Sequence, residues 1–409
     1  MGSPVTRTLP FATRARGITG SVIDASTSLL AAQDHDIVRF AMGSPAPEAI
    51  PTDALAEIAA EVLGRSTADS YDYGPTEGEP TLRAELLATL AGADGTELDP
   101  DELLITSGGM QGLDLACKLF VDPGDCVAVE APTYTNGSAV ITGYGGQLLE
   151  VGVDADGIDV AALRELGERR PPKLIYVIPN FQNPSGVTLA GERRIELIAL
   201  AERWGAVILE DDPYRELRFA GEPQLSLRAL AAGSDAIVIS VHTFSKVLAP
   251  GLRVGWVQAD PAVIAAMIDA KQGLDTCTSV PAQRLVAGFL ARGLLPGHVR
   301  GLRERYRDGK LTLQAALGES FPEREVHWTD PDGGFFLWLT LWDSIDTEAL
   351  FATALAEGVA YIPGPAFSAS GRFADSLRLT FATTLGERTW EGVRRLRAAV
   401  DRHLVGGDG

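Results

Sequence analysis

Five short apolar segments, separated by stretches long enough for helices, constrain the fold more than any other feature of this sequence. They are rich in β-branched residues and lie at residues 103–106, 126–130, 173–178, 206–210 and 236–241. Strands that alternate with helices form a mostly parallel sheet with helices on both faces. Ligands of such sheets bind at the carboxyl ends of the strands. We therefore predict an α/β protein whose functional residues follow these strands.

The alternation ends after Trp256, where longer helical segments begin. Helices are predicted at about residues 261–271, 281–292 and 296–317. A smaller α+β part follows, and the last helix is expected to be amphipathic and rich in arginine. Three regions are predicted on this basis: an N-terminal arm with a small-domain segment (1–50), a large domain (51–320) and a small C-terminal α+β domain (321–409).

Composition and charge exclude several classes of function. The chain of 409 residues is 45% hydrophobic, so it can bury a large core, and its formal net charge of −20 would repel a nucleic-acid backbone. Cys117, Cys126 and Cys277 are widely spaced, which argues against a zinc site or disulfides and for a reducing compartment. No apolar run approaches the length of a membrane-spanning helix. We expect a cytoplasmic protein without metal, nucleic-acid or membrane partners.

Lys246 lies in a loop with the composition of a phosphate site. The loop follows segment 236–241 and contains Thr243, Ser245 and Arg253, whose hydroxyl and guanidinium groups suit a phosphate. A lysine beside such a site suggests a phosphorylated aldehyde held as a Schiff base, and the alternative is a surface lysine paired with a carboxylate. The other four lysines of the chain are expected to be solvated: Lys118, Lys173, Lys271 and Lys310.

Residues with ligand-binding chemistry follow the other predicted strands. The glycine turn at residues 107–110 opens a helix, and its free N–H groups would favour an anion. Tyr134 could stack on a flat ring or belong to the core. Asn183 lies in a proline-rich turn, where its amide could cap the turn or bind a ligand. Asp211 would need a partner if buried, either a protonated ring nitrogen or an arginine elsewhere.

Three further positions outside this series have open interpretations. Arg378 alternates with leucines in a predicted strand, so it could clamp a carboxylate or face solvent. Tyr73 could offer its phenol to a phosphate or be a packed, structural residue. Gly43 could line a cleft, where its missing side chain gives a ligand room, or belong to a connecting turn.

Together these residues resemble, in order and approximate spacing, the class I/II aminotransferases of pyridoxal phosphate fold type I. The resemblance covers nearly the whole chain and rests on Tyr73-Gly74, Ser107-Gly108-Gly109, Tyr134, Asn183-Pro184-x-Gly186, Asp211-x-Pro213-Tyr214, Thr243-x-Ser245-Lys246, Arg253 and Arg378. Residues 210–214 and 243–253 are most similar to the 2-aminoadipate and kynurenine type II aminotransferase branch. The resemblance implies a large domain with a mostly parallel, seven-stranded sheet and a smaller α+β domain.

The resemblance also implies roles for residues around pyridoxal 5'-phosphate. Lys246 would hold the cofactor as a Schiff base and move a proton, and Asp211 would keep the ring nitrogen protonated. Asn183 and Tyr214 would hydrogen-bond the ring oxygen, while Tyr134 would stack on the ring. The phosphate would be held by Ser107, Gly108, Gly109, Met110, Thr243, Ser245 and Arg253.

The substrates implied are an amino acid and a 2-oxo acid. Arg378 would bind the α-carboxylate, with Asn183 and Gly43 in the same pocket, and Tyr73 would complete the neighbouring site of a homodimer. At the phosphate turn the chain has Met110 where this branch usually has glutamine, so only backbone donors are expected there.

Asp24 is the departure that bears on the choice of substrate. The segment Ser21-Val-Ile-Asp24 matches a helix in which 2-aminoadipate enzymes have arginine at the fourth position, where it contacts an acidic side chain. An aspartate there would disfavour a dicarboxylic substrate, unless Arg14 or Arg16 substitutes. We therefore expect an L-α-amino acid with a neutral, aromatic or basic side chain as donor, and an acceptor such as 2-oxoglutarate.

Two alternatives remain open at this point. The same lysine and aspartate also support elimination, cyclisation or oxidation of an amino acid. A cofactor-sensing regulatory domain, of the kind fused to DNA-binding helices, is an alternative from a different class, although the negative charge of the chain argues against it.

Overall fold

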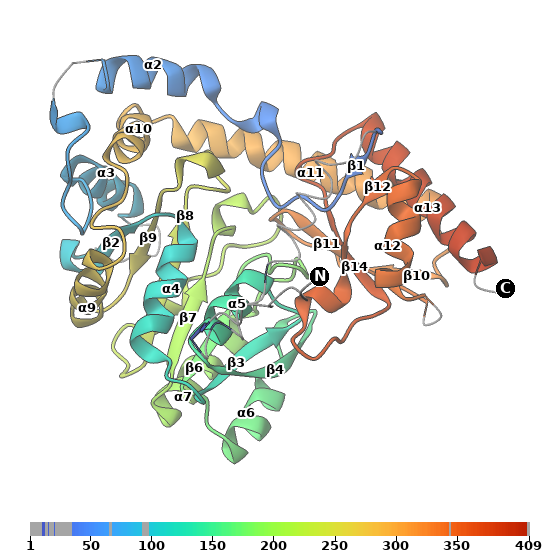
Figure 1. Cartoon of the computed structure of the whole chain (residues 1–409), viewed down its shortest axis with the longest axis horizontal. Helices are drawn as coiled ribbons and strands as arrows, with labels where there is room; N and C mark the ends of the chain where they lie inside the picture. Colours follow the sequence, from blue (N-terminus) through green and yellow to red (C-terminus); the bar gives the residue numbers. More distant parts are fainter. Residues whose placement is uncertain are drawn as a thin grey trace, which may run out of the picture.

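An eight-stranded sheet forms the centre of the larger part of the molecule (Figure 1). The computed structural model describes residues 10–12, 15, 20, 35–64, 68–91, 98–342 and 345–406. The strands follow the order β2-β9-β8-β7-β6-β3-β4-β5. Neighbouring strands from β8 to β4 are parallel, while β9 runs antiparallel to both β2 and β8. The prediction of an α/β fold with a mostly parallel sheet is confirmed.

All five predicted strands are present in this sheet. Their bounds are β2 (Leu103–Thr106), β3 (Cys126–Ala131), β6 (Leu174–Val177), β7 (Val207–Asp211) and β8 (Ile237–Thr243). The remaining strands are β4 (Gln147–Asp154), β5 (Gly157–Ile158) and β9 (Gly255–Gln258). The expected number of seven strands is one too low, because the chain turns back after β4 and Gly157, at φ +94°, begins the short antiparallel strand β5.

Helices cover both faces of the sheet and separate the hydrophobic core into two main clusters. On one face pack α4 (Gly109–Phe120), α5 (Thr135–Gly143) and α9 (Pro261–Gln272), and on the other α6 (Val160–Arg169), α7 (Gly191–Trp204) and α8 (Leu227–Leu230). Leu113 and Val241 belong to the first cluster, whereas Leu197 and Ile208 belong to the second. Alternate residues of the buried strands thus enter different cores, as the pleat requires.

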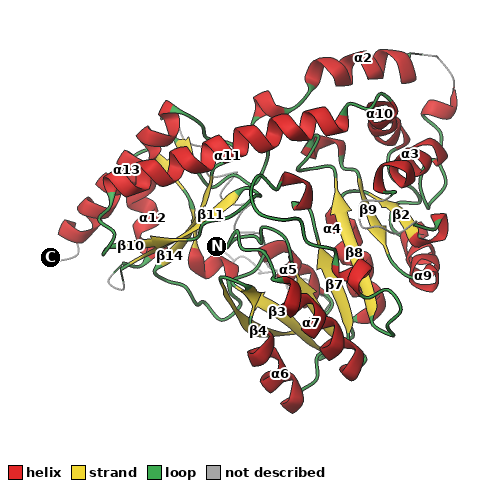
Figure 2. Cartoon of the chain, turned by 180° about the vertical axis from the view of Figure 1, so that it is seen from behind, coloured by secondary structure: helices red, strands yellow, loops and turns green. Residues whose placement is uncertain are grey.

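A long helix connects the large sheet with the smaller part of the molecule (Figure 2). This helix, α11 (Leu295–Ser320), begins beside a helical cluster and ends against α13 (Glu387–Gly406). The cluster consists of α2 (Thr52–Val62), α3 (Pro80–Leu90) and α10 (Val280–Ala291). The apolar face of α13 is buried, so the expectation of an amphipathic final helix is confirmed.

The smaller part contains a four-stranded antiparallel sheet in the order β10-β11-β14-β13. Its elements are β10 (Val326–Trp328), β11 (Phe336–Leu341), α12 (Thr347–Ala356), β13 (Ile362–Pro363) and β14 (Ser376–Thr380). Strand β1 (Val38–Arg39) pairs in parallel with β12 (Val359–Ala360). This pairing attaches the segment around Gly43 to the C-terminal part of the chain.

Two lysines that were expected to be solvated are buried. Lys271 is 0% exposed and its Nζ lies 2.6 Å from Asp275 Oδ1, and Lys310 forms an ion pair with Asp330. In both cases the aliphatic stem lies in a packed helix face while the ammonium reaches a carboxylate at its edge. The helical positions of the two lysines did not reveal these partners, because Asp275 and Asp330 each lie beyond the end of the helix that carries the lysine.

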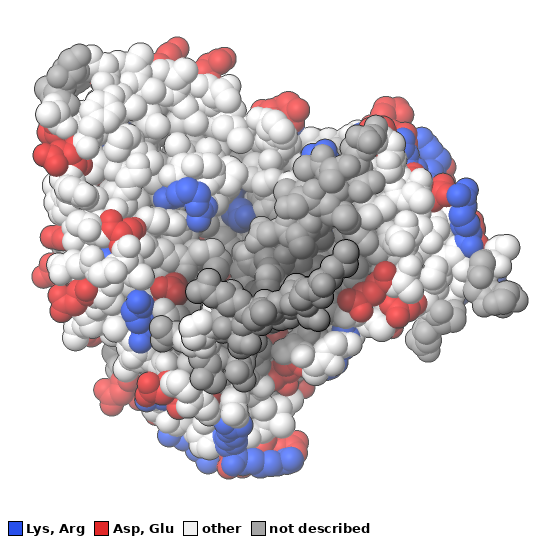
Figure 3. Space-filling model, viewed as in Figure 1, with Lys and Arg blue, Asp and Glu red and all other residues white. Residues whose placement is uncertain are grey.

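Acidic and basic side chains are interspersed on the face shown in Figure 3, and its described part carries no large basic patch. Among the described helices, none combines the length and apolar character needed to cross a bilayer. Within the same part of the chain, no cluster of three or more histidine, cysteine or acidic side chains could hold a metal ion.

The contact between α11 and the small domain should depend on Gly309. A Cβ atom at this position would lie 2.4 Å from the carbonyl oxygen of Phe381, so Gly309→Ala should lower the thermal midpoint by an amount equivalent to about 1–3 kcal/mol. Gly301 of the same helix has nothing within 4 Å, and Gly301→Ala should raise the midpoint by the equivalent of about 1 kcal/mol. Equal shifts of the two variants in calorimetry would contradict this account of the contact.

Candidate functional site

Most of the predicted site residues lie where the eight-stranded sheet meets the four-stranded sheet and the segment around Gly43. Asp211 ends β7, Lys246 follows β8, and Asn183 lies in the loop after β6. Arg378 approaches from β14, one of the two inner strands of the small sheet, and its Nη1 donates a hydrogen bond of 2.9 Å to Asn183 Oδ1. Residues that were predicted from their positions after strands therefore lie close together, although they are distant in the sequence.

Lys246 has an amine whose charge is poorly stabilised by its surroundings. Its Nζ donates a hydrogen bond of 2.7 Å to the carbonyl oxygen of Gly43 and lies 5.8 Å from the centre of the Phe335 ring. No ion pair with Lys246 occurs among the described residues. Burial and the neighbouring charge of Arg378 lower the pKa of Lys246 to about 8, although Asp211 partly opposes the shift. The alternative of a surface lysine paired with a carboxylate is therefore wrong.

Asp211 is a buried carboxylate without an arginine partner in the described structure. Its Oδ2 accepts a hydrogen bond of 2.8 Å from the hydroxyl of Tyr176, and desolvation raises the pKa of Asp211 to about 7. Tyr176 lies in β6. A tyrosine in such an apolar strand is usually a core residue, so the sequence did not indicate its contact with Asp211. A Cβ atom at Gly137 would lie 2.5 Å from the Tyr176 hydroxyl, so this glycine makes room for it.

The start of α4, beside Arg253, has hydrogen-bond donors that suit an anion. Gly108 is the N-terminal cap of this helix at φ +81° and supplies no side-chain cap, which leaves N–H groups of the first turn directed outward. Arg253 Nη1 donates to Ser245 Oγ at 3.4 Å, and Thr243 Oγ1 donates to the same oxygen at 2.8 Å. A Cβ atom at Gly108 would lie 2.4 Å from Arg253 Nη2, so a larger residue would displace this guanidinium, and the φ of +81° itself favours glycine.

The backbone of Arg253 itself is left-handed, with φ +53°. Residues other than glycine adopt this conformation at a cost of roughly 1 kcal/mol or more. The turn nevertheless directs the guanidinium to the helix N-terminus, where Nη2 lies 3.4 Å from the carbonyl oxygen of Ser107.

Ser107 itself has its polar groups engaged within the protein. Its hydroxyl donates to Asp275 Oδ2 at 2.8 Å, and its N–H donates to Gln111 Oε1 at 2.8 Å. Asp275 also accepts hydrogen bonds from Gln111 at 2.7 Å and from the buried Lys271 at 2.6 Å. Ser107 thus anchors the glycine turn to the partly buried ion pair of Lys271 and Asp275, and the outward donors at this turn come from the residues that follow it.

Arg378 is a buried cation with no carboxylate partner among the described residues. It is 1% exposed, and its Nη2 donates a hydrogen bond of 2.7 Å to the carbonyl oxygen of Ala41. The guanidinium lies 4.1 Å from the centre of the Phe336 ring and 5.2 Å from that of Phe367. Burial lowers the pKa of Arg378 to about 10. The alternative of a solvent-facing arginine is wrong, and Nε of Arg378 has no hydrogen-bond partner among the described residues.

The remaining aromatic residues and Gly43 shape the space between these groups. Tyr214 is buried against Phe335, with ring centres 5.5 Å apart, and burial raises the pKa of its hydroxyl. The hydroxyl of Tyr134 lies 3.8 Å from the sulfur of Met110, at the start of α4. A Cβ atom at Gly43 would meet Phe336 at 3.6 Å, an ordinary contact distance.

Two predicted residues are not placed in this site by the structure. Tyr73 is 82% exposed, on the loop before α3. Asp24 lies outside the described residues, as do Arg14 and Arg16.

The chemistry of the described residues fits pyridoxal phosphate. The uncapped helix N-terminus and Arg253 match its phosphate, and the buried carboxylate of Asp211 matches a protonated ring nitrogen, which would relieve its unpaired burial. Lys246 supplies an amine whose pKa is close to neutral, as Schiff-base formation requires.

Comparisons with known proteins agree with this geometry. The family model of aminotransferase class I and II matches residues 36–396. Aromatic-amino-acid aminotransferase 1 of Thermococcus litoralis is 36% identical over 399 residues, which cover 96% of this chain and 94% of the relative.

Solved structures give the same result. The crystal structure of alpha-aminoadipate aminotransferase (LysN) from Thermus thermophilus, complexed with N-(5'-phosphopyridoxyl)-L-leucine, matches with a TM-score of 0.89 and 37% identity, over 97% of this chain and 98% of its own. The kynurenine aminotransferase of Pyrococcus horikoshii, in complex with PMP, matches with a TM-score of 0.88 and 35% identity, over 97% and 98% of the two chains.

Bacterial HTH-type transcriptional regulators are also relatives, at 27 to 32% identity. The family model nevertheless spans most of the chain, and the relatives that match with the higher identities are aminotransferases. The chain therefore belongs to the aminotransferase class I and II family of pyridoxal-phosphate enzymes.

Proposed function

We propose that this protein transfers the amino group of an L-α-amino acid with a neutral, aromatic or basic side chain to a 2-oxo acid such as 2-oxoglutarate. The observation that carries this proposal is the placement of a low-pKa amine, Lys246, beside a buried carboxylate, Asp211, and a buried cation, Arg378. The name of the Thermococcus litoralis relative supports an aromatic donor.

Pyridoxal phosphate, when bound, supplies a ring that accepts the electrons left at Cα after the amino acid loses its proton. Asp211 would stabilise the proton on the ring nitrogen, and the Tyr176 hydroxyl orients this carboxylate. Asn183 and Tyr214 would donate hydrogen bonds to the ring oxygen, while Tyr134 would cover one face of the ring.

The phosphate would be held by Arg253 together with the hydroxyl and N–H donors around the start of α4. These donors are Gly108, Gly109, Met110, Thr243 and Ser245, with Ser107 as the anchor of the turn. The N-terminus of α4 carries the positive end of the helix dipole, and the Arg253 guanidinium adds a full positive charge beside it. The protein would therefore need little reorganisation to bind the phosphate.

Lys246 would first hold the cofactor covalently and then, displaced by the substrate amine, carry the proton between Cα and the cofactor carbon. A base with a pKa of about 8 is suited to this exchange, since both of its protonation states are populated near neutral pH. Gly43 would leave room for the substrate beside this amine.

Arg378 would bind the substrate α-carboxylate. Its position beside Asn183 and the Ala41 carbonyl fixes the plane of the guanidinium, which favours a bidentate contact. A carboxylate held in this way would direct the Cα–H bond of the substrate toward Lys246.

We also propose a homodimer in the cytoplasm. Tyr71 and Tyr73 are 67% and 82% exposed, which is unusual for two tyrosines so close together on one loop and supports a partner surface there. Tyr73 of the partner subunit would then complete the phosphate site. The free cysteines support a reducing compartment. The separation of the eight-stranded from the four-stranded sheet supports the division into residues 1–50, 51–320 and 321–409.

The proposed reaction predicts a spectroscopic result for the purified protein loaded with pyridoxal 5'-phosphate. The visible band of the lysine-bound cofactor should be lost when a preferred amino acid is added and should return with 2-oxoglutarate. Lys246→Ala should lack this band without added amine, and its turnover should fall by about a thousandfold or more. The control is Lys173→Ala, which removes an exposed lysine and should leave both measurements unchanged. Product release with the band retained would instead indicate elimination.

The ion pair of Lys271 and Asp275 behind the glycine turn should influence the affinity for the cofactor. Lys271→Met leaves Asp275 without its cation next to the phosphate turn, so the dissociation constant of the cofactor, followed by absorption, should rise about tenfold. The double variant Lys271→Met/Asp275→Asn removes the uncompensated charge and should recover most of the affinity. A double variant as weak as the single one would show that the charge of Asp275 is not the cause.

The choice of donor should depend on Asp24. The native protein should turn over an aromatic amino acid and arginine faster than 2-aminoadipate, and Asp24→Arg should raise kcat/KM for 2-aminoadipate by about tenfold. Asp24→Asn is the control that removes charge without adding a cation. A clear preference of the native protein for 2-aminoadipate would overturn the substrate proposal and leave the transfer reaction itself standing.

A further inference from the structure

Asn183 lies in a loop whose two ends meet. The loop consists of residues 179–189, between β6 and α7, and a backbone hydrogen bond of 2.9 Å joins its first residue to its last. Asn183 lies in the middle of the loop, where it accepts a hydrogen bond from Arg378. Phe181 has a left-handed backbone with φ +50°, which costs free energy in a residue other than glycine. Such a loop keeps its conformation only where the surrounding structure holds it.

A single buried side chain, that of Arg194 on α7, holds both ends of this loop. Arg194 is 0% exposed. Its Nη2 donates a hydrogen bond of 2.8 Å to the carbonyl oxygen of Pro179, and its Nε donates one of 2.9 Å to that of Leu189. Its Nη1 donates to the carbonyl oxygen of Leu225 at 2.9 Å. Because these acceptors belong to the main chain, the guanidinium determines the path of the backbone.

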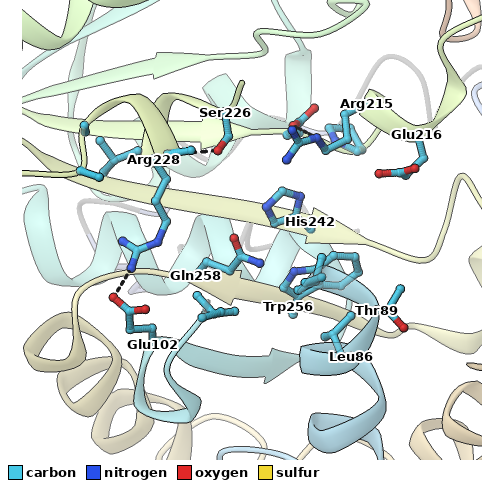
Figure 4. Close-up of a pocket in the computed structure, with 18 of the residues that line it drawn as sticks. Leu86, Thr89, Glu102, Arg215, Glu216, Ser226, Arg228, His242, Trp256 and Gln258 are labelled. Atoms are coloured by element: carbon cyan, nitrogen blue, oxygen red, sulfur yellow. Dashed lines mark hydrogen bonds and ion pairs between the residues drawn. The ribbon is translucent and has the colours of Figure 1, made fainter. Parts of the chain in front are cut away.

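The positive charge of Arg194 has no ion-pair partner in the part of the chain that the structure describes. Its Nη2 also donates to Asn180 Oδ1 at 2.9 Å, and Asn180 Nδ2 donates to Asp212 Oδ1 at 2.9 Å. Arg215, whose Nε lies 3.4 Å from Asp212 Oδ2, lines a cavity beside β8 (Figure 4). The network thus connects the loop with the end of β7.

The packing of α7 does not itself require a cation at this position. The other buried side chains of this helix are apolar: Leu197, Ile198, Leu200 and Ala201. Burial lowers the pKa of Arg194, although the charges of Glu210 and Asp212 partly oppose the shift. A buried cation without an ion pair destabilises the fold unless its donors are satisfied. The loop supplies most of the acceptors that satisfy Arg194, so the guanidinium serves the loop.

We propose that Arg194 is a positioning residue for Asn183. By holding both ends of the loop, Arg194 sets the orientation of the Asn183 amide, whose Oδ1 is directed to Arg378 and whose Nδ2 would donate to the cofactor. This role rests on the proposed contact between Asn183 and the ring oxygen of pyridoxal 5'-phosphate. Lysine would not replace Arg194, because one ammonium group cannot reach acceptors that are spread around a planar fork.

The pH midpoint of the visible band of the lysine-bound cofactor tests this role. A hydrogen bond to the ring oxygen stabilises the deprotonated form of the bound cofactor, so a weaker bond should raise the midpoint. Arg194→Lys and Asn183→Ala should each raise it by about 0.5 to 1 pH unit. Arg193→Lys makes the same substitution at the neighbouring position of α7, where the guanidinium pairs with Asp154, and should leave the midpoint unchanged.

A double variant separates positioning from a general loss of stability. Since Arg194 acts through Asn183, the variant Arg194→Lys/Asn183→Ala should have the same midpoint as Asn183→Ala alone. A role of Arg194 in stability only would leave the midpoint of Arg194→Lys at the native value. That result, or a shift in the double variant equal to the sum of the two single shifts, would overturn the proposal.

Asn180→Ala provides the test if Arg194→Lys does not fold. It removes one of the four hydrogen-bond partners of Arg194 and should raise the midpoint in the native background, with no further rise in the Asn183→Ala background. An unchanged midpoint in Asn180→Ala would then overturn the proposal. A native band that does not respond to amino acids would contradict only the transfer reaction, because the midpoint is measured without substrate. A native protein that forms no visible band with the cofactor would overturn both.

Discussion

The desolvation of two ionisable groups at neighbouring strand ends is the constraint on which the rest of this structure depends. Lys246 and Asp211 have pKa values of about 8 and 7, each displaced from its ordinary value toward neutrality. Neither has a full counter-ion among the described residues, and their partners are a backbone carbonyl and the phenol of Tyr176. Such groups destabilise the fold on their own, so two packed cores must hold them in place.

The cation of the site, Arg378, comes from the smaller part of the molecule. Arg378 lies on an inner strand of the small sheet, near two phenylalanine rings, and contacts Asn183 of the large part. The β1–β12 pairing brings the segment with Gly43 to the same place. A substrate held here would therefore touch both parts at once, and a small change in their relative position would alter the distance between the carboxylate site and the amine.

Much of this arrangement could be predicted from the sequence, because strand alternation and the strand-end rule are local patterns. Asp211, Asn183 and Lys246 were found in this way. The burial of Lys271 could not be predicted, since the buried face of α9 is decided by packing against distant helices. Tyr176 was missed for a related reason, because its apolar strand gives no sign of the carboxylate on the adjacent strand. Asp24 stays a prediction from the sequence alone.

The left-handed backbone of Arg253 has a consequence for anyone who would engineer this protein. A glycine at this position would relax the main chain at φ +53° and would remove the guanidinium from the start of α4. Selection of variants by heat resistance would therefore favour a substitution that selection by turnover rejects. Libraries built for thermal tolerance should keep arginine at this position, because glycine would relieve the backbone strain whereas the enzyme needs the guanidinium.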